Sequence, residues 1–443
     1  MKHRAFARGR RVAAGGFFLL IVWTLVACQT VHHGRTDPRL WEVPESITTA
    51  VRDEPRENLA QLISYIQEQS SNEREAFRYA HDWVAKNVVY DYAVYEGTAE
   101  GGREPYEVIA HGKAVCEGYA RTLKLLCDEL DIECRYIVGY VRGVDDPGTE
   151  AALQSPEDAD RSRHAWNAVR LDNTWYLVDV TWNAAWFLDD DGLTLNYSHN
   201  YFQPPPEHFI HTHFPDETRW QLLDEPITFA EFKTLPALTP AFFRYGLRPI
   251  ETYASAITPV GNTYSLQFAV PEGVRLTGVL ADPSAADDAE YRHYDLVTLS
   301  PSGVQTVDIR FPGPGNYAFN LWAKYETDDG RYDHAATYHF DVPETAEGAR
   351  PYLTTYSRFR EHRIRDLEPA DRVLERGTVQ SFSFSTDVNR RYYLYAPDHE
   401  KHRFSRNRET GRYEAVALLE SDSVYLAVRR GDRYRYLAKF LVE

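Results

Sequence analysis

The chain has 443 residues, and its 66 Asp and Glu residues outnumber its 49 Lys and Arg residues, which gives a formal net charge of −17 at pH 7. A chain of this length exceeds one ordinary hydrophobic core, so we expect several domains. The acidic charge argues against nucleic acid and against anionic lipid headgroups as partners. Solubility explains such a surface, and an affinity for basic substrate proteins is the alternative.

The N-terminus has the pattern of a secretory signal. Five basic residues lie within residues 2–11, and an apolar run from Val12 to Val26 follows them and ends at Leu25-Val26-Ala27-Cys28. The run of about 15 residues is short for a spanning helix, which needs about 20. We expect cleavage before Cys28 and lipidation of Cys28, as in bacterial lipoproteins, with residues 28–44 as a tether. The protein would then be extracytoplasmic and held at a bacterial membrane by this lipid alone. Loss of residues 1–27, with five basic residues and no acidic ones, moves the formal charge to −22.

Two amphipathic helices are expected after the tether. Apolar residues recur at three- and four-residue spacing within residues 58–69 and residues 74–87. The two stripes consist of Leu59, Leu62, Ile63 and Ile66, and of Phe77, Ala80, Val84 and Val88. This periodicity places each stripe on one helix face, which we expect to pack in a core.

A third helix is expected from Val115 to Leu130, with Cys116 in its first turn. Its apolar residues follow helical spacing at Tyr119, Leu123, Leu126, Cys127 and Leu130. Unpaired backbone N–H groups and the positive end of the helix dipole lower the pKa of a thiol at this position. The same N–H groups could hold the oxyanion of a tetrahedral intermediate.

Two alternating apolar runs, 164–171 and 174–182, predict a β-hairpin. Asp172-Asn173 separates them and suits a two-residue turn. With this turn, Leu171 pairs with Thr174, and residue 164 lies opposite residue 181. Asp179 is then one diagonal step from His164 on the same face of the hairpin. A carboxylate at this position can reach the imidazole.

Cys116, His164 and Asp179 together supply the thiol, imidazole and carboxylate of a cysteine nucleophile triad. A thiol is mostly protonated at neutral pH, so it needs a base beside it, and the base needs a third group that fixes its tautomer. Each residue alone has an ordinary alternative, as a core cysteine, a surface histidine or a turn aspartate. Their joint placement in suitable elements favours the triad.

Three motifs resemble the transglutaminase-like superfamily, whose core is papain-like. They are Cys-x-Gly-Tyr-Ala from Cys116, His-Ala-Trp-Asn from His164, and Trp-Tyr-Leu-Val-Asp-Val-Thr-Trp ending at Trp182. The segment 201–232, with Tyr-Phe, His-Phe-Pro, Trp-Gln-Leu-Leu and Glu-Phe, is similar to the kyphoscoliosis peptidase branch. The resemblance implies that Cys116 is the nucleophile, His164 the general base and Asp179 the residue that orients it. A proline run at 204–206 departs from this branch and should alter only a surface loop.

After residue 249 the helical periodicity gives way to short alternating runs, which predict two β-sandwiches. The runs of the first are 263–270, 274–280, 305–311, 316–325 and 336–342, and those of the second are 380–384, 392–395, 413–419, 423–429 and 434–442. Both units end in similar segments, which we interpret as a diverged tandem repeat of immunoglobulin-like modules. The fold class is therefore α+β, with a papain-like, transglutaminase-like domain (45–248) followed by modules at 249–345 and 352–443.

The other cysteines and histidines do not predict a metal site. Cys127 and Cys134 lie at a helix end and a strand start, and we favour buried free thiols over a disulfide. His208, His211 and His213 cluster in a loop, but no nearby Cys, Asp or Glu completes a familiar ligand pattern. We expect no metal and no cofactor.

The sequence thus predicts a membrane-anchored enzyme that attacks an amide carbonyl through Cys116 and forms a thioester acyl-enzyme. Its substrate would be a protein or peptide. Water as the acceptor makes it a peptidase or amidase, which the resemblance favours. With a lysine amine as the acceptor, it would be a protein-glutamine transglutaminase that cross-links proteins. With water as the acceptor, the same enzyme would deamidate glutamine. A non-enzymatic module that binds a peptide in the cleft is the further alternative.

Overall fold

The computed structural model describes residues 42–142, 162–184, 186–189, 192–195, 197–251, 253–254, 256–282, 289–328, 330–345, 347–396, 401–431 and 433–443. The predicted signal segment 1–27, the lipidation of Cys28 and most of the tether 28–44 lie outside these residues and stay predictions. Within the described residues, no helix combines the length and the apolar character that crossing a membrane requires.

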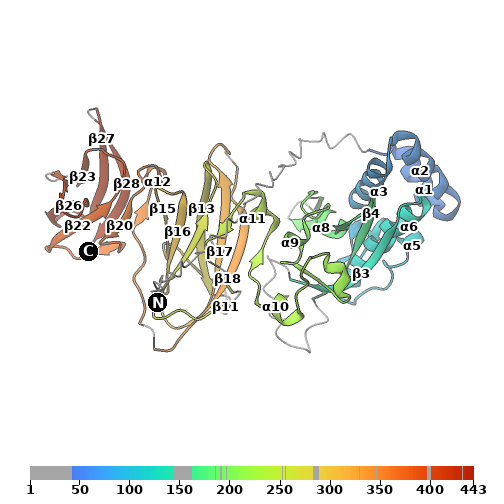
Figure 1. Cartoon of the computed structure of the whole chain (residues 1–443), viewed down its shortest axis with the longest axis horizontal. Coiled ribbons are helices and arrows are strands. Elements are labelled where there is room, and N and C mark those ends of the chain that lie inside the picture. Colours follow the sequence, from blue (N-terminus) through green and yellow to red (C-terminus); the bar gives the residue numbers. More distant parts are fainter. Residues whose placement is uncertain are drawn as a thin grey trace, which may run out of the picture. The chain divides into compact units, whose positions relative to one another are not determined.

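The N-terminal domain, residues 42–234, combines helices with a small antiparallel sheet (Figure 1). Its helices are α1 (Glu45–Asp53), α2 (Pro55–Gln69), α3 (Glu73–Asn87), α4 (Tyr92–Tyr95), α5 (Pro105–His111), α6 (Cys116–Glu129), α8 (Val180–Ala184), α9 (Pro206–Phe209), the 3₁₀ helix η2 (Thr218–Gln221) and α10 (Phe229–Thr234). Its strands are β1 (Val89–Tyr90), β2 (Lys113–Ala114), β3 (Cys134–Val141), β4 (Arg163–Leu171), β5 (Thr174–Val178), β6 (Trp186–Asp189), β7 (Gly192–Leu195) and β8 (His213–Pro215). The main sheet has the order β5-β4-β3-β8.

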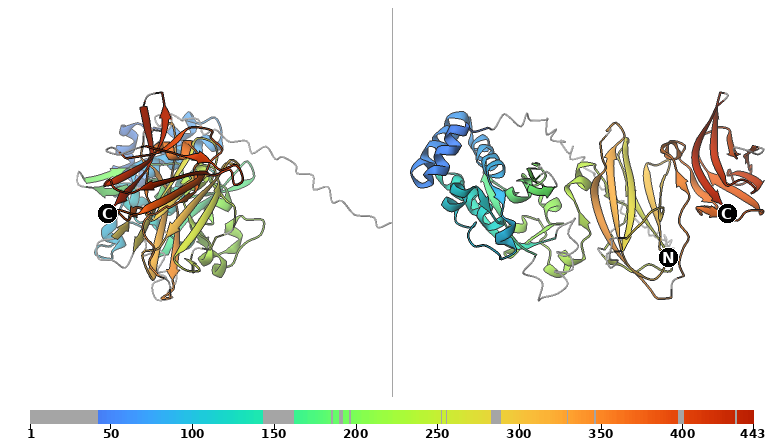
Figure 2. Two further views of the ribbon diagram at one scale, coloured as in Figure 1. Left: turned by 90° about the vertical axis from the view of Figure 1, so that its left-hand side faces the viewer. Right: turned by 180° about the vertical axis from the view of Figure 1, so that it is seen from behind.

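Each face of this sheet packs in its own hydrophobic cluster. The larger cluster joins the predicted stripes of α2, α3 and α6 to Val169, Leu171 and Val178 of the sheet. The smaller cluster contains Trp166 and Leu177, which alternate with those residues along β4 and β5. Figure 1 shows α1, α2, α5 and α6 gathered on one side of β3 and β4, and Figure 2 shows the same grouping from behind.

The predicted hairpin forms, but its second strand is shorter than expected. Leu171 pairs with Thr174, and both turn residues, Asp172 and Asn173, have positive φ angles of 48° and 64°. A type I′ turn requires such angles at its two central residues. The expected pairing of residue 164 with residue 181 is wrong, because β5 ends at Val178 and residues 180–184 form helix α8. Asp179 therefore lies at a junction between a strand and a helix.

The first β-sandwich, residues 237–342, has two facing sheets. Its elements are β9 (Ala237–Leu238), α11 (Pro240–Arg244), β10 (Arg248–Pro249), β11 (Ala256–Ile257), β12 (Thr263–Ala269), β13 (Val274–Asp282), β14 (Ala289–Tyr291), β15 (Asp295–Leu299), β16 (Val304–Arg310), β17 (Gly315–Tyr325) and β18 (Asp333–Val342). One sheet has the order β10-β12-β16-β15. The other has the order β11-β18-β17-β13-β14, with β9 also paired to β18. Its core includes Leu238, Phe242 and Leu247, which precede the boundary predicted at residue 249.

The second β-sandwich, residues 354–442, repeats this plan. Its elements are β19 (Thr354–Thr355), α12 (Ser357–Glu361), β20 (Arg365–Glu368), β21 (Val373–Leu374), β22 (Val379–Ser385), β23 (Tyr392–Tyr395), β24 (His402–Arg403), β25 (Ser405–Arg406), β26 (Tyr413–Leu418), β27 (Ser423–Arg430) and β28 (Arg433–Val442). Its sheets have the orders β20-β22-β26-β25 and β19-β28-β27-β23-β24, with β21 also paired to β28. The strand orders match one for one, and both final hairpins carry a register shift, next to Leu321 and next to Leu426. The tandem repeat predicted from the sequence is thus present in the fold.

Candidate active site

Cys116 is the first residue of α6, and tight local packing fixes its position. The strand β2 precedes it and pairs in parallel with β1, and the Val115 N–H donates to the Gly102 carbonyl at 3.2 Å. A Cβ at Gly118 would lie 2.2 Å from the same Gly102 oxygen. Only glycine therefore lets the first turn of α6 approach this loop so closely. No side chain of the described residues caps α6, so its first-turn N–H groups stay available to a ligand.

The surroundings of Cys116 favour its thiolate. Burial alone would raise the pKa of the thiol, but the positive charge of His164, a hydrogen bond with the His164 side chain and another from the Ala165 backbone together lower the pKa below its ordinary value. The thiol is only partly buried. A low-pKa, accessible thiolate is the form of cysteine that acts as a nucleophile.

His164 lies between Cys116 and Asp179 and is 7% exposed. On β4 it pairs with Gly139 of β3. Its Nε2 lies 2.8 Å from Oδ2 of Asp179, so Nδ1 is the nitrogen left for the thiol. Burial lowers the pKa of the imidazole, but the charges of Asp179 and Cys116 and its hydrogen bonds to both outweigh burial and raise the pKa above its ordinary value. A thiolate beside an imidazolium is the resting state that these two shifts favour.

Asp179 is fully buried, and it is held from several directions. Its backbone N–H donates to the Tyr201 carbonyl at 3.0 Å, and its Oδ1 accepts the backbone N–H of Trp182 at 3.0 Å. The second contact caps the start of α8, which explains why the chain turns into a helix here. Burial would raise the pKa of the carboxyl, but the charge and hydrogen bond of His164 and a hydrogen bond from His213 hold the pKa well below its usual range.

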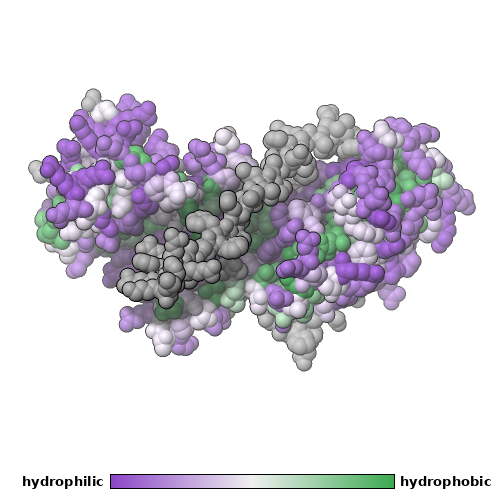
Figure 3. All heavy atoms as spheres, in the orientation of Figure 1, coloured by the Kyte–Doolittle hydropathy of each residue, from purple (hydrophilic) through white to green (hydrophobic). Residues whose placement is uncertain are grey.

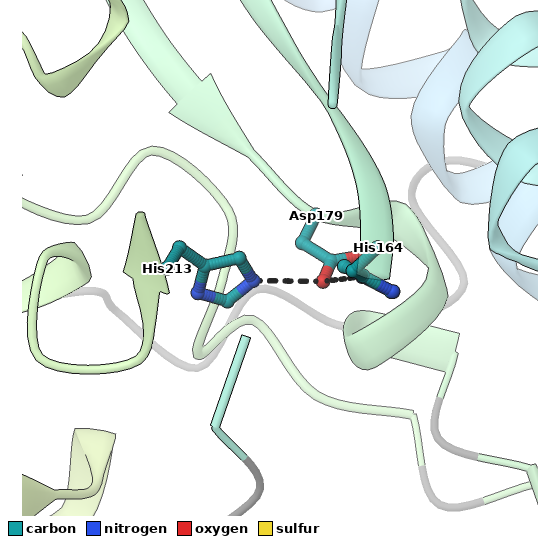
Figure 4. A group of neighbouring side chains, drawn as sticks. All are labelled: His164, Asp179 and His213. Atoms are coloured by element: carbon teal, nitrogen blue, oxygen red, sulfur yellow. Dashed lines mark hydrogen bonds and ion pairs between the residues drawn. The ribbon is translucent and has the colours of Figure 1, made fainter. Parts of the chain in front are cut away.

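His213 completes the cluster, and the sequence analysis did not place it there. It lies on β8, which pairs with β3, and its Nε2 is 3.1 Å from the same Oδ2 of Asp179 that contacts His164 (Figure 4). No Cys, Asp or Glu near the histidines at 208–213 in the sequence completes a familiar ligand pattern, and Asp179 reaches His213 only through the fold. The sequence does not reveal this contact, because His213 and Asp179 are 34 positions apart in the chain. No local motif marks this contact.

His213 is neutral, and its contacts define its tautomer. Burial lowers the pKa of His213 to about 4. The hydrogen bond to Asp179 acts in the opposite direction and only partly offsets burial. An ionised Asp179 can only accept, so Nε2 of His213 carries the proton and donates. Its Nδ1 then accepts from the Thr212 hydroxyl at 2.8 Å. The ring stacks on Phe209, with centroids 3.9 Å apart, and meets Trp182 edge to face at 4.5 Å.

A second buried network supports α8 from the opposite end. His81 of α3 is fully buried, with one ring nitrogen 2.9 Å from the Asp82 carboxylate and the other 3.0 Å from the Asn183 side-chain amide. The side-chain oxygen Oδ1 of Asn183 in turn accepts the Tyr201 backbone N–H at 2.8 Å. Because the Tyr201 carbonyl also accepts the Asp179 backbone N–H, these bonds connect helix α3 to Asp179, the hydrogen-bond partner of His164.

His164, Asp179 and His213 are also the described residues best placed to hold a metal ion, with ligand atoms within 4.8 Å of one another. Both histidines reach the same carboxylate oxygen, at 2.8 and 3.1 Å, which are hydrogen-bond lengths. We therefore assign these contacts as hydrogen bonds. The other two histidines of the loop lie elsewhere, since His208 stacks on Phe243 and His211 contacts the Pro236 carbonyl.

Comparisons with known proteins agree with this architecture. Residues 60–180 match the model of the Transglutaminase-like superfamily, and residues 229–353 match that of the KY-like, immunoglobulin-like domain. The chain therefore has a transglutaminase-like domain followed by an immunoglobulin-like domain, as the sequence predicted.

Two curated relatives are similar to this chain over part of their length. The human protein named Kyphoscoliosis peptidase is 27% identical over 279 residues, which cover 62% of this chain and 39% of the human chain. Hillarin of Drosophila melanogaster is 27% identical over 314 residues, covering 66% of this chain and 37% of its own. A solved structure described as a TGase is 19% identical and covers 36% of this chain and 38% of its own, with a TM-score of 0.24. The chain thus spans less than half the length of these two relatives.

The structure brings the three predicted site residues into one coupled group and adds His213 to it. Cys127 and Cys134 are buried free thiols, as expected. Cys127 hydrogen-bonds to Cys134, and burial raises its pKa well above the ordinary value, so it stays protonated and unreactive. Cys116 thus differs from Cys127, because the surroundings of Cys116 lower the pKa of its thiol.

Proposed function

We propose that this protein is a cysteine acyl-transfer enzyme, most simply a peptidase or amidase, that acts on a protein or peptide through Cys116, His164 and Asp179. The observation that carries the proposal is the position of His164, whose Nε2 lies 2.8 Å from Oδ2 of the buried Asp179 and whose ring interacts with Cys116 at the start of α6. Burial opposes charge on both side chains, yet the thiol pKa is lowered and the imidazole pKa is raised. Structural cysteines in cores show the opposite shift, as Cys127 does.

The geometry supports a defined sequence of steps. The Cys116 thiolate attacks an amide carbonyl, and the first-turn N–H groups of α6 stabilise the oxyanion that forms. The imidazolium of His164 gives its proton to the leaving amine, so the C–N bond breaks and a thioester remains. His164, now neutral, takes a proton from the incoming water or amine. Collapse of the second tetrahedral intermediate releases the acyl group and restores the thiolate.

The acceptor decides between a peptidase and a transglutaminase. The human relative is named Kyphoscoliosis peptidase, a name that indicates hydrolysis. As part of the proposal, we assign the same reaction to this chain. Mass spectrometry separates the two reactions, because a peptide bond cut by water yields two shorter chains. Transfer to a tagged amine keeps the backbone intact and adds the tag to a glutamine with loss of ammonia. Tag incorporation without cleavage would replace the peptidase by the transglutaminase.

The pH profile of Cys116 alkylation tests whether the enzyme is primed. We expect wild-type Cys116 to be alkylated at pH values below the ordinary thiol range, because its pKa is lowered. The change His164→Ala removes the charge and the hydrogen bond that lower this pKa, while burial remains. Alkylation of that variant should therefore shift above the ordinary thiol pKa of about 8.5.

His111→Ala is the matched control, because His111 is an exposed histidine that ends helix α5. Its alkylation profile should match the wild type, and circular dichroism should show that all variants are folded. If wild type and His164→Ala titrate together near the free-thiol value, Cys116 and His164 are uncoupled. A non-enzymatic peptide-binding module would then replace the enzyme as the proposed function.

A further inference from the structure

The second β-sandwich contains an open cleft of about 920 Å³, and half of the described residues that line it are arginines. Five of its described lining residues are Arg390, Arg391, Arg403, Arg406 and Arg429. No Asp or Glu is among the described residues that line it. This concentration of one charge contrasts with the acidic composition of the whole chain.

The fold assembles this cleft from separate strands. Arg390 and Arg391 directly precede β23, Arg403 ends β24, Arg406 ends β25, and Arg429 lies on β27. These strands come from both sheets of the sandwich. The buried rings of Phe404 and Tyr413 also line the cleft and give it an apolar base. Strands of both sheets, and the segment just before β23, therefore bring together arginines from separate parts of the sequence.

Other arginines of the same sandwich have carboxylate partners. Arg363 and Arg365 pair with Asp387 at 3.0 and 3.1 Å, and Arg376 pairs with Asp422 at 2.6 Å. Among the described residues, no carboxylate lies within ion-pair distance of four cleft arginines, Arg390, Arg391, Arg403 and Arg406. Like charges that converge without counter-charges repel one another, and an anionic ligand would relieve this repulsion.

The charge of the surrounding segment supports the same conclusion. Residues 352–443 contain 18 Lys and Arg residues and 14 Asp and Glu residues, a net charge of +4, although the whole chain carries −17. In Figure 3 the visible face of this sandwich is mostly hydrophilic. A positive module attracts anions locally, whatever the charge of the distant domains, because salt screens charges beyond about 8–10 Å.

We propose that this cleft binds a ligand that carries several phosphate groups. Guanidinium groups bind phosphate through two parallel hydrogen bonds, and their charge persists at every physiological pH. The five arginines offer more hydrogen-bond donors than one carboxylate can accept. The cleft is also larger than a single phosphate. The site is independent of Cys116 and recruits the protein to a phosphorylated molecule or surface.

Calorimetric titration of the full chain with inorganic tripolyphosphate tests the proposal. We expect saturable binding that weakens as salt increases, and much weaker binding of single phosphate ions. The double change Arg391→Gln/Arg403→Gln removes two cleft charges while keeping polar side chains. It should weaken tripolyphosphate binding about tenfold or more, since hydrogen bonds to charged groups are among the strongest in proteins.

Arg433→Gln/Arg435→Gln is the matched control, because it removes the same charge from exposed positions of β28 that do not line the cleft. Binding by this control should stay within about twofold of wild type, a change of less than 0.5 kcal/mol. The proposal is overturned if tripolyphosphate does not bind, or if both double variants weaken binding equally. Thermal unfolding should show that each variant is folded.

Vesicles distinguish the two sources of such phosphates. Phosphatidylglycerol vesicles that bind the wild type but not the cleft variant, and that tripolyphosphate displaces, identify lipid headgroups as ligands. Tripolyphosphate binding without vesicle binding identifies a soluble phosphorylated ligand. Both results support the cleft as the binding site.

Discussion

Asp179 accepts hydrogen bonds from two imidazole rings at one carboxylate oxygen. His164 is a hydrogen-bond partner of the thiol, whereas His213 faces a closed aromatic environment of Phe209, Trp166 and Trp182. Burial lowers the pKa of His213 to about 4, so its ring is neutral near pH 7. The neutral ring therefore donates a hydrogen bond that favours the ionised form of Asp179 and fixes the orientation of its carboxylate. In the proposed enzyme His213 would be a positioning residue, because it would act on the reaction through its hydrogen bond to Asp179.

Replacing His213 separates its hydrogen bond from its packing. His213→Phe keeps an aromatic ring among its neighbours but removes the donor to Asp179. A hydrogen bond to a charged group contributes about 1.5–3 kcal/mol, so we expect kcat to fall roughly 10- to 100-fold. Weaker stabilisation of the Asp179 charge should also raise the Cys116 pKa, which alkylation at several pH values measures.

His213→Gln is the comparison, since its amide N–H can still donate to the carboxylate. It should recover part of kcat and return the alkylation profile toward that of the wild type. If the Phe and Gln variants lose activity equally and their profiles match the wild type, His213 serves packing alone.

The residues of the proposed triad were predictable because each lies in a motif with its own local signal. A cysteine at a helix start and a histidine and an aspartate on one hairpin need only short-range rules. His213 has no such signal, because its partner lies 34 residues away and β8 is a three-residue edge strand. Only the pairing of β8 with β3 brings the two side chains together.

At the scale of elements, two glycines allow the close approaches that build the site. A Cβ at Gly118 would meet the Gly102 carbonyl, and a Cβ at Gly139 would lie 2.2 Å from the Phe214 carbonyl and 2.6 Å from the Trp166 ring. Gly139 thus lets β8 and the Trp166 ring close on β3. This contact places His213 opposite Asp179. The sequence contains both glycines, but neither has a positive φ, so no turn pattern reveals their role.

The junction of β5 and α8 shows where periodicity misled the prediction. The alternation of residues 174–182 continues past Val178, so it predicts one long strand. Asp179 ends that strand, because its Oδ1 accepts the Trp182 N–H and its carbonyl accepts the Asn183 N–H at 3.1 Å. Side-chain capping of a helix start competes with strand pairing, and at Asp179 the chain forms the capped helix α8 instead of a longer strand. The predicted contact between His164 and Asp179 forms all the same, because the register is correct up to Val178.

At the scale of the whole molecule, charge is unevenly distributed along the chain. The chain's −17 led us to expect no affinity for anionic headgroups, yet its last 92 residues carry +4. Electrostatic forces on a ligand depend on the charges near it, since salt screens the rest. The proposed phosphate cleft therefore belongs to one module and does not contradict the charge of the chain.

The tandem repeat also shows where the first module begins. In the second sandwich, β19 and α12 precede β20, and β19 pairs with the last strand, β28. Their counterparts in the first sandwich are β9 and α11, and β9 pairs with the last strand, β18. Because β9 and α11 are short and Pro-rich around residues 236–240, their sequence gives no strong periodic signal. The composition shift near residue 249 instead marks the start of the longer strands.

Two fragments of the chain test this boundary. A fragment of residues 236–443 keeps β9 and α11, whereas a fragment of residues 249–443 lacks the buried side chains of Leu238, Phe242 and Leu247. Removal of one large buried side chain commonly costs about 2–5 kcal/mol, so the shorter fragment should lose at least about 4 kcal/mol in its first sandwich. Chemical unfolding should show this as a much earlier transition, or as a first sandwich that does not fold. The second sandwich is intact in both fragments and provides the internal control, because its transition should not move. Identical unfolding curves would mean that the first module begins at residue 249 and that β9 and α11 only lie against it.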